Sequence, residues 1–263
     1  MRVGLAAVTL WTVALILKWP IPKAPGIWFA FLCMGLINNV IPFSLIVWGQ
    51  KEIASGLASI LNAATPMFTI LVAGLMLPDE RITRLKVVGI VIGFAAVIIM
   101  IGPSALGGLG DQLWAQLAVV GATISYAFAG AYGRRFREMG VDPNVTAAGQ
   151  VTASTVVLVP ITLMIEDPLS LPFPSLATVG SIIGVAVLST AMAYVLYFKI
   201  LARAGALNLL LVTLLIPVSA IGLGWLVLGE QLETVHFVGL ALLAVGLSAI
   251  DGRLWQRKPF SAT

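Results

Sequence analysis

The chain alternates long apolar runs with short polar breaks, and this pattern continues over its whole length. Each run is bounded by charged residues, proline or glycine, and a helix needs roughly 20 apolar residues to cross a bilayer. We therefore predict an all-α integral membrane protein with nine visible transmembrane helices. Their expected ranges are residues 3–17, 26–48, 55–77, 85–101, 112–132, 144–165, 175–201, 206–228 and 235–250.

Composition agrees with a membrane environment. Hydrophobic residues make up 60% of the 263 positions and charged residues only 10%, whereas soluble domains carry about 25% charged residues. The net charge of +4 does not indicate a nucleic-acid partner, because no basic run is longer than the cluster at 134–137. Basic residues between apolar runs indicate membrane topology instead.

The basic residues predict how the helices are oriented. If every run crosses the membrane once, all Lys and Arg residues except Arg2 and Lys51 fall on one side. An excess of Lys and Arg marks the cytoplasmic side of a membrane protein. We therefore expect an inner-membrane protein with Met1 outside and a cytoplasmic C-terminal tail over residues 252–263.

An internal repeat predicts how the helices are organised. Residues 56–89 are similar to residues 205–239. Both share a mid-run proline, an acidic turn and a glycine in the last helix, namely Pro66 and Pro217, Glu80 and Glu230, and Gly89 and Gly239. The two turns fall on opposite sides of the membrane, which predicts inverted halves of the kind found in secondary transporters.

The two halves have unequal numbers of helices. We expect a first repeat over residues 1–104 and a second, inverted repeat over residues 112–251. The first contains four of the predicted runs and the second contains five. We therefore expect a ten-helix (5+5) inverted-repeat transporter fold, with its first helix absent from this chain.

In their order and repetition, these features resemble the drug/metabolite transporter (DMT) superfamily and, within it, the EamA-type branch. The motifs that carry the resemblance are Ala63-Ala64-Thr65-Pro66 and Leu215-Ile216-Pro217, Asp79-Glu80-Arg81 and Gly229-Glu230, and the helices containing Gly89 and Gly239. The resemblance implies export or exchange of small metabolites, with exporters of neutral and aromatic amino acids as a prominent group. The chain departs from the family because the Trp-Gly motif of the family's first helix has no counterpart before Met1.

The apolar runs lack the residues that catalysis would need. They contain no Asp or Glu near their middle, and the single histidine, His236, lies at the start of the last run. Because catalysis generally needs a nucleophile with a base or a metal, we expect no enzymatic activity, no catalytic residue, no metal and no cofactor. Glu80 and Glu230 each precede a new helix, which favours capping of that helix over proton transfer.

Neutral polar residues inside the apolar runs are the candidates for substrate binding, because a buried amide without a partner costs about a few kcal/mol. We expect them to line one cavity near the midplane, although such residues also join helices by hydrogen bonds. Pro42 should free the backbone carbonyl of Asn38. The candidate site residues are Asn38, Asn39, Asn62, Thr65, Tyr126, Gln150, Thr190 and Tyr194, and the candidate hinges are Pro42, Pro66 and Pro217.

Together these features predict a secondary transporter that works by alternating access. Its expected partners are the lipid bilayer and a small polar or zwitterionic substrate, foremost a neutral or aromatic amino acid. The alternatives are a passive channel for small solutes, a transporter of another class such as nucleotide sugars or drugs, and a scaffold or enzyme subunit.

Overall fold

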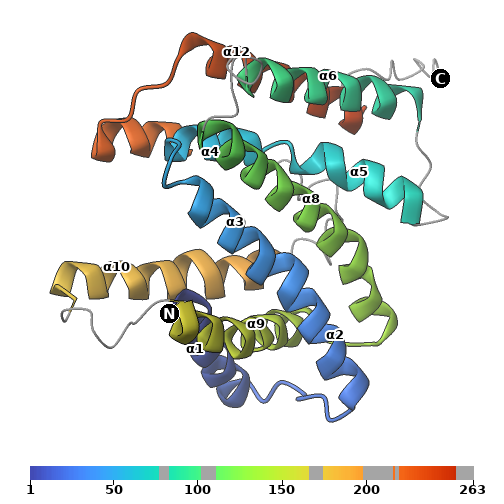
Figure 1. The fold of residues 1–263 in the computed structure, drawn as a ribbon. Coiled ribbons are helices and arrows are strands. Elements are labelled where there is room, and N and C mark those ends of the chain that lie inside the picture. The colour runs from blue at the N-terminus through green and yellow to red at the C-terminus, as the bar shows by residue number, and fades with distance from the viewer. Residues whose placement is uncertain (77–82, 102–110, 166–173, 198–215, 217–218, 253–263) are drawn as a thin grey trace, which may run out of the picture. The chain divides into compact units, whose positions relative to one another are not determined.

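The computed structural model describes residues 1–76, 83–101, 111–165, 174–197, 216 and 219–252, and within them every regular element is a helix (Figure 1). The prediction of an all-α chain is confirmed for these residues. In chain order, the elements are α1 (Arg2–Ile16), α2 (Pro25–Gly35), η1 (Leu36–Val40), α3 (Ile41–Gly49), α4 (Ser55–Asn62), α5 (Thr65–Met76), α6 (Arg84–Ile101), α8 (Asp111–Glu138), α9 (Pro143–Ile165), α10 (Leu176–Ala186), η2 (Val187–Met192), η3 (Gly224–Leu228) and α12 (Thr234–Asp251). The elements η1, η2 and η3 are π-helical.

Several of these elements join into spans that are long and apolar enough to cross a membrane. Among the described residues there are five, namely Pro25–Gly49, Ser55–Met76, Gln112–Glu138, Pro143–Ile165 and Leu176–Tyr197. Shorter apolar helices cover Arg2–Ile16, Ser219–Leu228 and Thr234–Ile250. Most bounds agree with the predicted runs within a few residues, whereas much of the run predicted over 206–228 lies outside the described residues. The count of nine helices stays a prediction.

The predicted end of the fifth run, at residue 132, is wrong. Helix α8 continues to Glu138, and Gly140 follows in the left-handed region with φ of 66°. The extension contains Arg135 and Arg137, whose long side chains can lie along apolar surface while their charged ends reach water. A criterion based on uninterrupted apolar sequence therefore ends this helix too early.

Two of the spans contain a π-helical segment in their interior. In the span Pro25–Gly49, η1 ends two residues before Pro42, and the N–H of Ile41 donates to the carbonyl of Leu36, five residues earlier. Proline has no N–H and cannot continue the hydrogen bonds of an α-helix. The π turn therefore lies next to a position where an α-helical hydrogen bond is already missing. In the span Leu176–Tyr197, η2 occupies the corresponding interior position without a proline.

The span Ser55–Met76 is interrupted where the sequence places Pro66. Helix α4 ends at Asn62 and α5 begins at Thr65. In an α-helix, the carbonyl of Asn62 would accept from residue 66, which has no N–H. The hydroxyl of Thr65 donates to this carbonyl instead, at 2.6 Å. The Thr-Pro pair therefore breaks the helix and satisfies the carbonyl that the break exposes.

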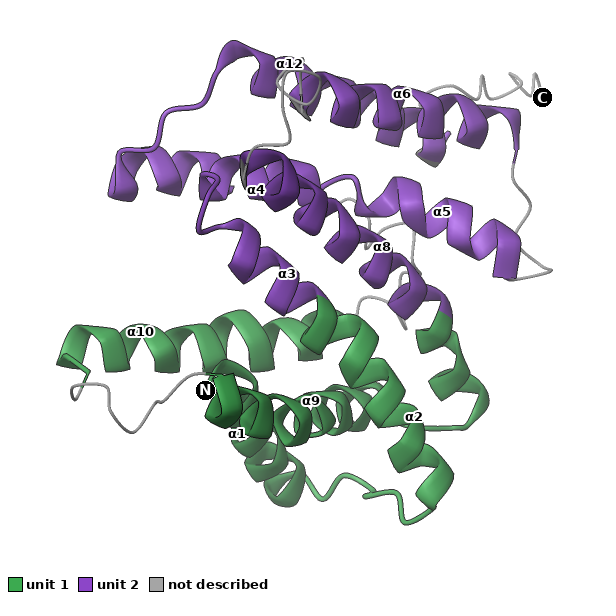
Figure 2. Cartoon of the chain, in the orientation of Figure 1, with its two compact units in different colours: residues 1–41, 132–209 green, residues 42–131, 210–263 purple. Residues whose placement is uncertain are grey.

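The chain divides into two compact units, coloured green and purple in Figure 2. Unit 1 consists of Met1–Ile41 and Tyr132–Leu209. Within its described part, α1 and α2 both pack against α9, and α1 also packs against α10 and η2. Gly149 on α9 leaves room for the ring of Phe31 on α2, because a Cβ at position 149 would lie 2.3 Å from that ring.

Unit 2 consists of Pro42–Ala131 and Leu210–Thr263. Its most extensive helix pair is α6 with α12, and these helices also pack on α5 and α4 respectively. The buried side chains at the centre of the unit include Ile60, Leu61, Met67, Val119 and Leu243.

Glycines allow the backbones of α6 and α12 to approach closely, and their contacts are reciprocal. A Cβ at Gly89 would meet the carbonyl of Gly246 at 2.5 Å and then Ile250, whereas a Cβ at Gly239 would meet Met100 and then Ala96. The residues of the two contacts correspond in pairs that are 150 positions apart in the sequence. These pairs are Gly89 and Gly239, Ala96 and Gly246, and Met100 and Ile250. The same contact is therefore made twice, once from each helix.

Candidate functional site

Two adjacent asparagines connect η1 to α9 within unit 1. Asn38 Nδ2 donates to Gln150 Oε1 at 3.0 Å, and Asn39 Nδ2 donates to Ser154 Oγ at 2.8 Å. Asn39, Gln150 and Ser154 have no exposed surface. Single-turn π segments are frequent at functional sites, and here the wider turn carries both asparagines.

Close packing of α2 on α9 brings these groups together. A Cβ at Gly35 would lie 2.8 Å from the carbonyl of Gln150 and 2.9 Å from Ser154 Oγ, so a side chain larger than hydrogen would separate the helices. The Ser154 hydroxyl donates to the Gln150 carbonyl at 2.7 Å while it accepts from Asn39. Ser154 therefore holds Asn39 in position and caps the carbonyl one turn earlier.

The span Leu176–Tyr197 supplies a third side of the same polar cluster. The hydroxyl of Tyr194 donates to Asn39 Oδ1. Thr190, one helical turn earlier and 1% exposed, lies in η2 and donates its own hydroxyl proton to the Val185 carbonyl at 2.8 Å. Arg2, the first residue of α1, donates from Nε to Thr190 Oγ1 at 2.8 Å. We call these seven residues the polar cluster: Arg2, Asn38, Asn39, Gln150, Ser154, Thr190 and Tyr194.

One donor of the polar cluster has no partner. Gln150 uses Oε1 to accept from Asn38, but its Nε2 is buried without a hydrogen bond. Leaving a buried amide donor unsatisfied costs about 1–3 kcal/mol, and most buried polar groups are paired with protein or water. Gln150 therefore presents a donor that a bound molecule could satisfy.

The structure gathers five of the eight predicted site residues in this cluster, namely Asn38, Asn39, Gln150, Thr190 and Tyr194. The other three, Asn62, Thr65 and Tyr126, belong to unit 2. There, Asn62 Oδ1 is buried without a partner, as is the hydroxyl of Ser59 one turn earlier. Of the predicted hinges, Pro42 follows η1 and Pro66 lies at the break between α4 and α5, whereas Pro217 lies outside the described residues.

Sequence reasoning missed Arg2, which we counted among the residues outside the membrane. It stands at the edge of the first apolar run, and nothing in the local sequence indicates that its side chain reaches η2. Ser154 carries a sequence signal, because it lies four residues after Gln150 and therefore on the same helical face.

In unit 2, Glu230 makes an unexpected helix cap. Its carboxylate accepts from the Ser55 hydroxyl at 2.7 Å, the Ser55 N–H at 3.0 Å and the Gly56 N–H at 3.2 Å. Burial by itself would raise the pKa of Glu230, but the hydrogen bonds from Ser55 and Gly56 outweigh it and lower the pKa below its usual value. The prediction that Glu230 caps the helix that follows it is wrong, because Glu230 caps α4 and the capping box of α12 is formed by Glu233 and His236.

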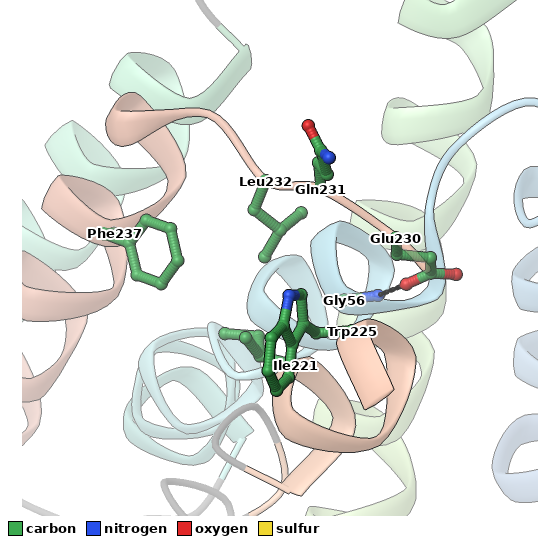
Figure 3. Close-up of a pocket in the computed structure, with 7 residues that line it drawn as sticks. All are labelled: Gly56, Ile221, Trp225, Glu230, Gln231, Leu232 and Phe237. Carbon is green, nitrogen blue, oxygen red and sulfur yellow. Dashed lines mark hydrogen bonds between the residues drawn. The ribbon is translucent and has the colours of Figure 1, made fainter. Parts of the chain in front are cut away.

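A pocket of 320 Å³ lies beside this cap (Figure 3). Its lining residues are Gly56, Ile221, Trp225, Glu230, Gln231, Leu232 and Phe237. The carboxylate of Glu230 is already bound to the start of α4, and Figure 3 shows the amide of Gln231 pointing away from Trp225. The pocket therefore presents mainly apolar walls, unlike the polar cluster of unit 1.

Comparisons with known proteins give a consistent assignment. An "Uncharacterized transporter" of Archaeoglobus fulgidus is 27% identical over 244 residues, which cover 90% of this chain and 82% of that protein. The "Uncharacterized inner membrane transporter YedA" of Escherichia coli K12 is 28% identical, over 81% of this chain and 68% of that protein. A "Probable terminal-alkyne amino-acid exporter" of Streptantibioticus cattleyicolor is 28% identical, over 83% of this chain and 71% of that protein.

A solved structure described as "Crystal structure of protein" has a TM-score of 0.69 at 16% identity, over 100% of this chain and 87% of that one, which shows a shared fold. The relatives named above are transporters rather than enzymes, as the sequence predicted. The resemblance to the EamA branch of the DMT superfamily is also confirmed. Since the model of the EamA-like transporter family matches residues 1–102 and 113–250, the chain is a membrane transporter that belongs to this family.

Proposed function

We propose that this transporter exports or exchanges small polar or zwitterionic metabolites, foremost neutral or aromatic amino acids, by alternating access. The observation that carries the proposal is the polar cluster, in which buried amides and hydroxyls meet and Gln150 Nε2 has no partner. A relative named as a probable amino-acid exporter supports the substrate class.

The chemistry of the cluster suits a molecule with both donors and acceptors. Amide and hydroxyl oxygens can accept from an ammonium group, while amide N–H and hydroxyl groups can donate to a carboxylate. The ring of Tyr194 offers a surface for an apolar side chain. In unit 2, Asn62, Thr65 and Tyr126 remain predicted contributors, and the buried unpartnered Asn62 Oδ1 supports this role for Asn62.

We further propose that residues 1–104 and 112–251 are inverted repeats related by a twofold axis in the membrane plane. The reciprocal contacts of Gly89 and Gly239 support this, because a twofold axis makes each contact occur twice with the partners exchanged. The π-helices agree, since η1 starts 11 residues after Pro25 and η2 starts 11 residues after Leu176. The π segments and the break before Pro66 are suitable hinges for alternating access.

The orientation in the inner membrane is also a proposal. The distribution of Lys and Arg supports a cytoplasmic position for Arg84, Arg135 and the C-terminal Arg257. Single cysteines at these three positions should resist a membrane-impermeant thiol reagent applied to intact cells and react after the membrane is opened. Labelling in intact cells would contradict this orientation.

The function is tested by counterflow in proteoliposomes that contain the purified protein. Internal and external amino acids, nucleotide sugars and drug-like cations are compared. Saturable uptake that depends on an internal amino acid is the expected result. Non-saturable flux without exchange would indicate a passive channel, and preference for a nucleotide sugar or drug would contradict the substrate class.

The site is tested by replacing Gln150 with methionine, which keeps the length of the side chain and removes both the unpartnered Nε2 and the Oε1 that accepts from Asn38. Loss of the hydrogen bond that Nε2 would donate to the substrate should raise the half-saturating substrate concentration roughly two- to ten-fold. Gln116 provides a matched control, because it is also buried and has an unpartnered amide oxygen but lies in unit 2. Equal effects of Gln150→Met and Gln116→Met would contradict the assignment of the site.

A further inference from the structure

The pocket beside Glu230 lies within unit 2 and combines a carboxylate with apolar walls. Its volume of 320 Å³ is at the lower end of the range for pockets that hold small molecules, about 300–1,000 Å³. Trp225 is 69% exposed and Phe237 is 50% exposed, so a molecule from outside the protein can reach both rings. The polar cluster of unit 1 contributes no residue to this pocket.

The carboxylate of Glu230 carries a negative charge that no cation balances in the described part of the chain. Its partners there are the neutral residues Ser55 and Gly56. Their hydrogen bonds lower the pKa of Glu230, so the carboxylate is ionised near neutral pH. The positive end of α4 offsets only about half an elementary charge. The pocket therefore has a net negative charge on one wall.

The carboxylate also has room for one more hydrogen-bond donor. Two carboxylate oxygens can accept about four hydrogen bonds. The N–H groups of Ser55 and Gly56 supply two of these. The Ser55 hydroxyl lies 2.7 Å from Oε1 and 2.8 Å from Oε2, but its single proton supplies only one more. Because Glu230 is only partly buried, a ligand can approach the remaining position.

The shape and charge of the pocket favour an elongated cation. Figure 3 shows Glu230 and Phe237 on opposite sides, with Leu232 and Trp225 between them. A ligand can therefore meet the carboxylate with one end and the two rings with the other. Among the described lining residues, Glu230 is the only charged one, so an anion or a lipid phosphate would be repelled without a basic residue to bind it.

We propose that this pocket binds a small hydrophobic ammonium ion, with its charged group at Glu230 and its apolar group between Trp225 and Phe237. The ammonium N–H donates to the open position of the carboxylate, and the apolar group removes the pocket walls from water. The aromatic rings add an attraction for the positive charge. This inference does not depend on the substrate proposed for the polar cluster, so either can fail without the other.

The test measures equilibrium binding to the full purified chain in nanodiscs of phosphatidylcholine, with empty nanodiscs as the blank. The three probes are 4-phenylbutylammonium, 4-phenylbutanol and 4-phenylbutyrate, which share a ring and a chain but differ in charge. The amine is protonated at pH 7, as a lysine side chain is. Saturable binding should be tightest for the ammonium, weaker for the alcohol and weakest for the carboxylate.

Glu230→Gln is the decisive variant, because glutamine removes the charge but keeps an oxygen that can cap α4. It should weaken binding of the ammonium about five- to ten-fold, since a charge-assisted bond at a partly exposed site is lost. Binding of the neutral alcohol should change little. Glu233→Gln removes a carboxylate from the capping box of α12, outside the pocket lining, and should leave both affinities close to those of wild type.

Further variants test the apolar walls. Ile221→Trp fills the pocket and should abolish binding of both the ammonium and the alcohol. Trp225→Ala should weaken binding of the ammonium about two- to ten-fold, whereas Trp225→Phe should retain most of it. Trp114→Ala removes an exposed tryptophan from α8 and should have no effect. Elution as a single species in detergent shows that each variant is folded.

Four outcomes would overturn the proposal. Without saturable binding of the ammonium to wild-type protein, the pocket is not such a site. Equal affinity for the ammonium and the alcohol would show that the carboxylate serves α4 alone. Equal weakening of both by Glu230→Gln would give Glu230 a structural role only. Ammonium binding that survives Ile221→Trp unchanged would place the ligand elsewhere on the protein.

Discussion

Replacing Gly224 with alanine should displace Glu230 from the start of α4. A Cβ at position 224 would lie 2.5 Å from Glu230 Oε2, well inside contact distance. The clash involves Oε2, so the shift of the carboxylate should first weaken the bonds that Oε2 accepts from the Ser55 hydroxyl and the Gly56 N–H. Because these bonds satisfy N–H groups that a helix leaves without partners, their loss should destabilise the folded state.

The size of the effect follows from known caps. Losing an N-terminal cap costs about 0.5–2 kcal/mol, and a negative charge at a helix start contributes about 0.3–1 kcal/mol more. Glu230 is partly exposed, so screening by water favours the lower half of this range. About 1 kcal/mol shifts the midpoint of thermal unfolding by roughly 2–4 °C in a chain of this size.

Gly222→Ala is the matched control for Gly224→Ala. Position 222 is helical, and a Cβ there meets nothing within 4 Å. Alanine is the better helix former by about 0.8–1 kcal/mol, so the control should stabilise the protein slightly. Because alanine at position 224 gains a similar helix propensity, the loss of the cap is measured against the control: thermal unfolding in detergent at pH 7 should place Gly224→Ala about 2–4 °C below Gly222→Ala. A midpoint for Gly224→Ala equal to that of the control would refute the reasoning.

The pH dependence of the cap has a defined sign. Since the folded pKa of Glu230 is lowered from 4.5, the carboxylate stabilises the fold fully above the pKa of the unfolded chain. This stabilisation is lost as the pH falls from about 4.5 through the lower folded pKa. The midpoint difference between wild type and Glu230→Gln should therefore be largest near neutral pH and shrink in acid. A constant difference from pH 7 to pH 3 would exclude the ionised cap.

Two further predictions concern helix packing and the polar cluster. Tyr194→Phe leaves Asn39 Oδ1 without its tyrosine donor, so it should lower stability by about 1–3 kcal/mol and weaken exchange; unchanged unfolding and transport would show that water replaces the hydroxyl. Gly89→Ala should lower the unfolding midpoint more than Gly239→Ala, because the new Cβ meets a rigid backbone carbonyl in the first and a flexible methionine in the second; the reverse order would contradict the described packing of α6 on α12.

The spans could be predicted because their signal is local. A helix that faces lipid must satisfy its own backbone hydrogen bonds and expose apolar side chains, so length and hydropathy alone reveal it. Among the described residues, this rule located most helices, and it ended α8 too early because charged side chains continue that helix at Arg135 and Arg137. The polar faces were equally local, because Gln150 and Ser154 follow helical spacing.

The sequence by itself therefore determined the class of protein and most of the described spans, and it supplied candidate residues for binding a polar molecule. Only the tertiary structure decided which of them meet: Asn39 binds both Ser154 and Tyr194, and Arg2 reaches Thr190 across 188 positions of sequence. It also decided that Glu230 caps α4 instead of α12. The physical reason is that hydropathy and helical spacing are properties of a single helix. The hydrogen-bond partner of a side chain depends instead on how helices that are far apart in the chain pack together.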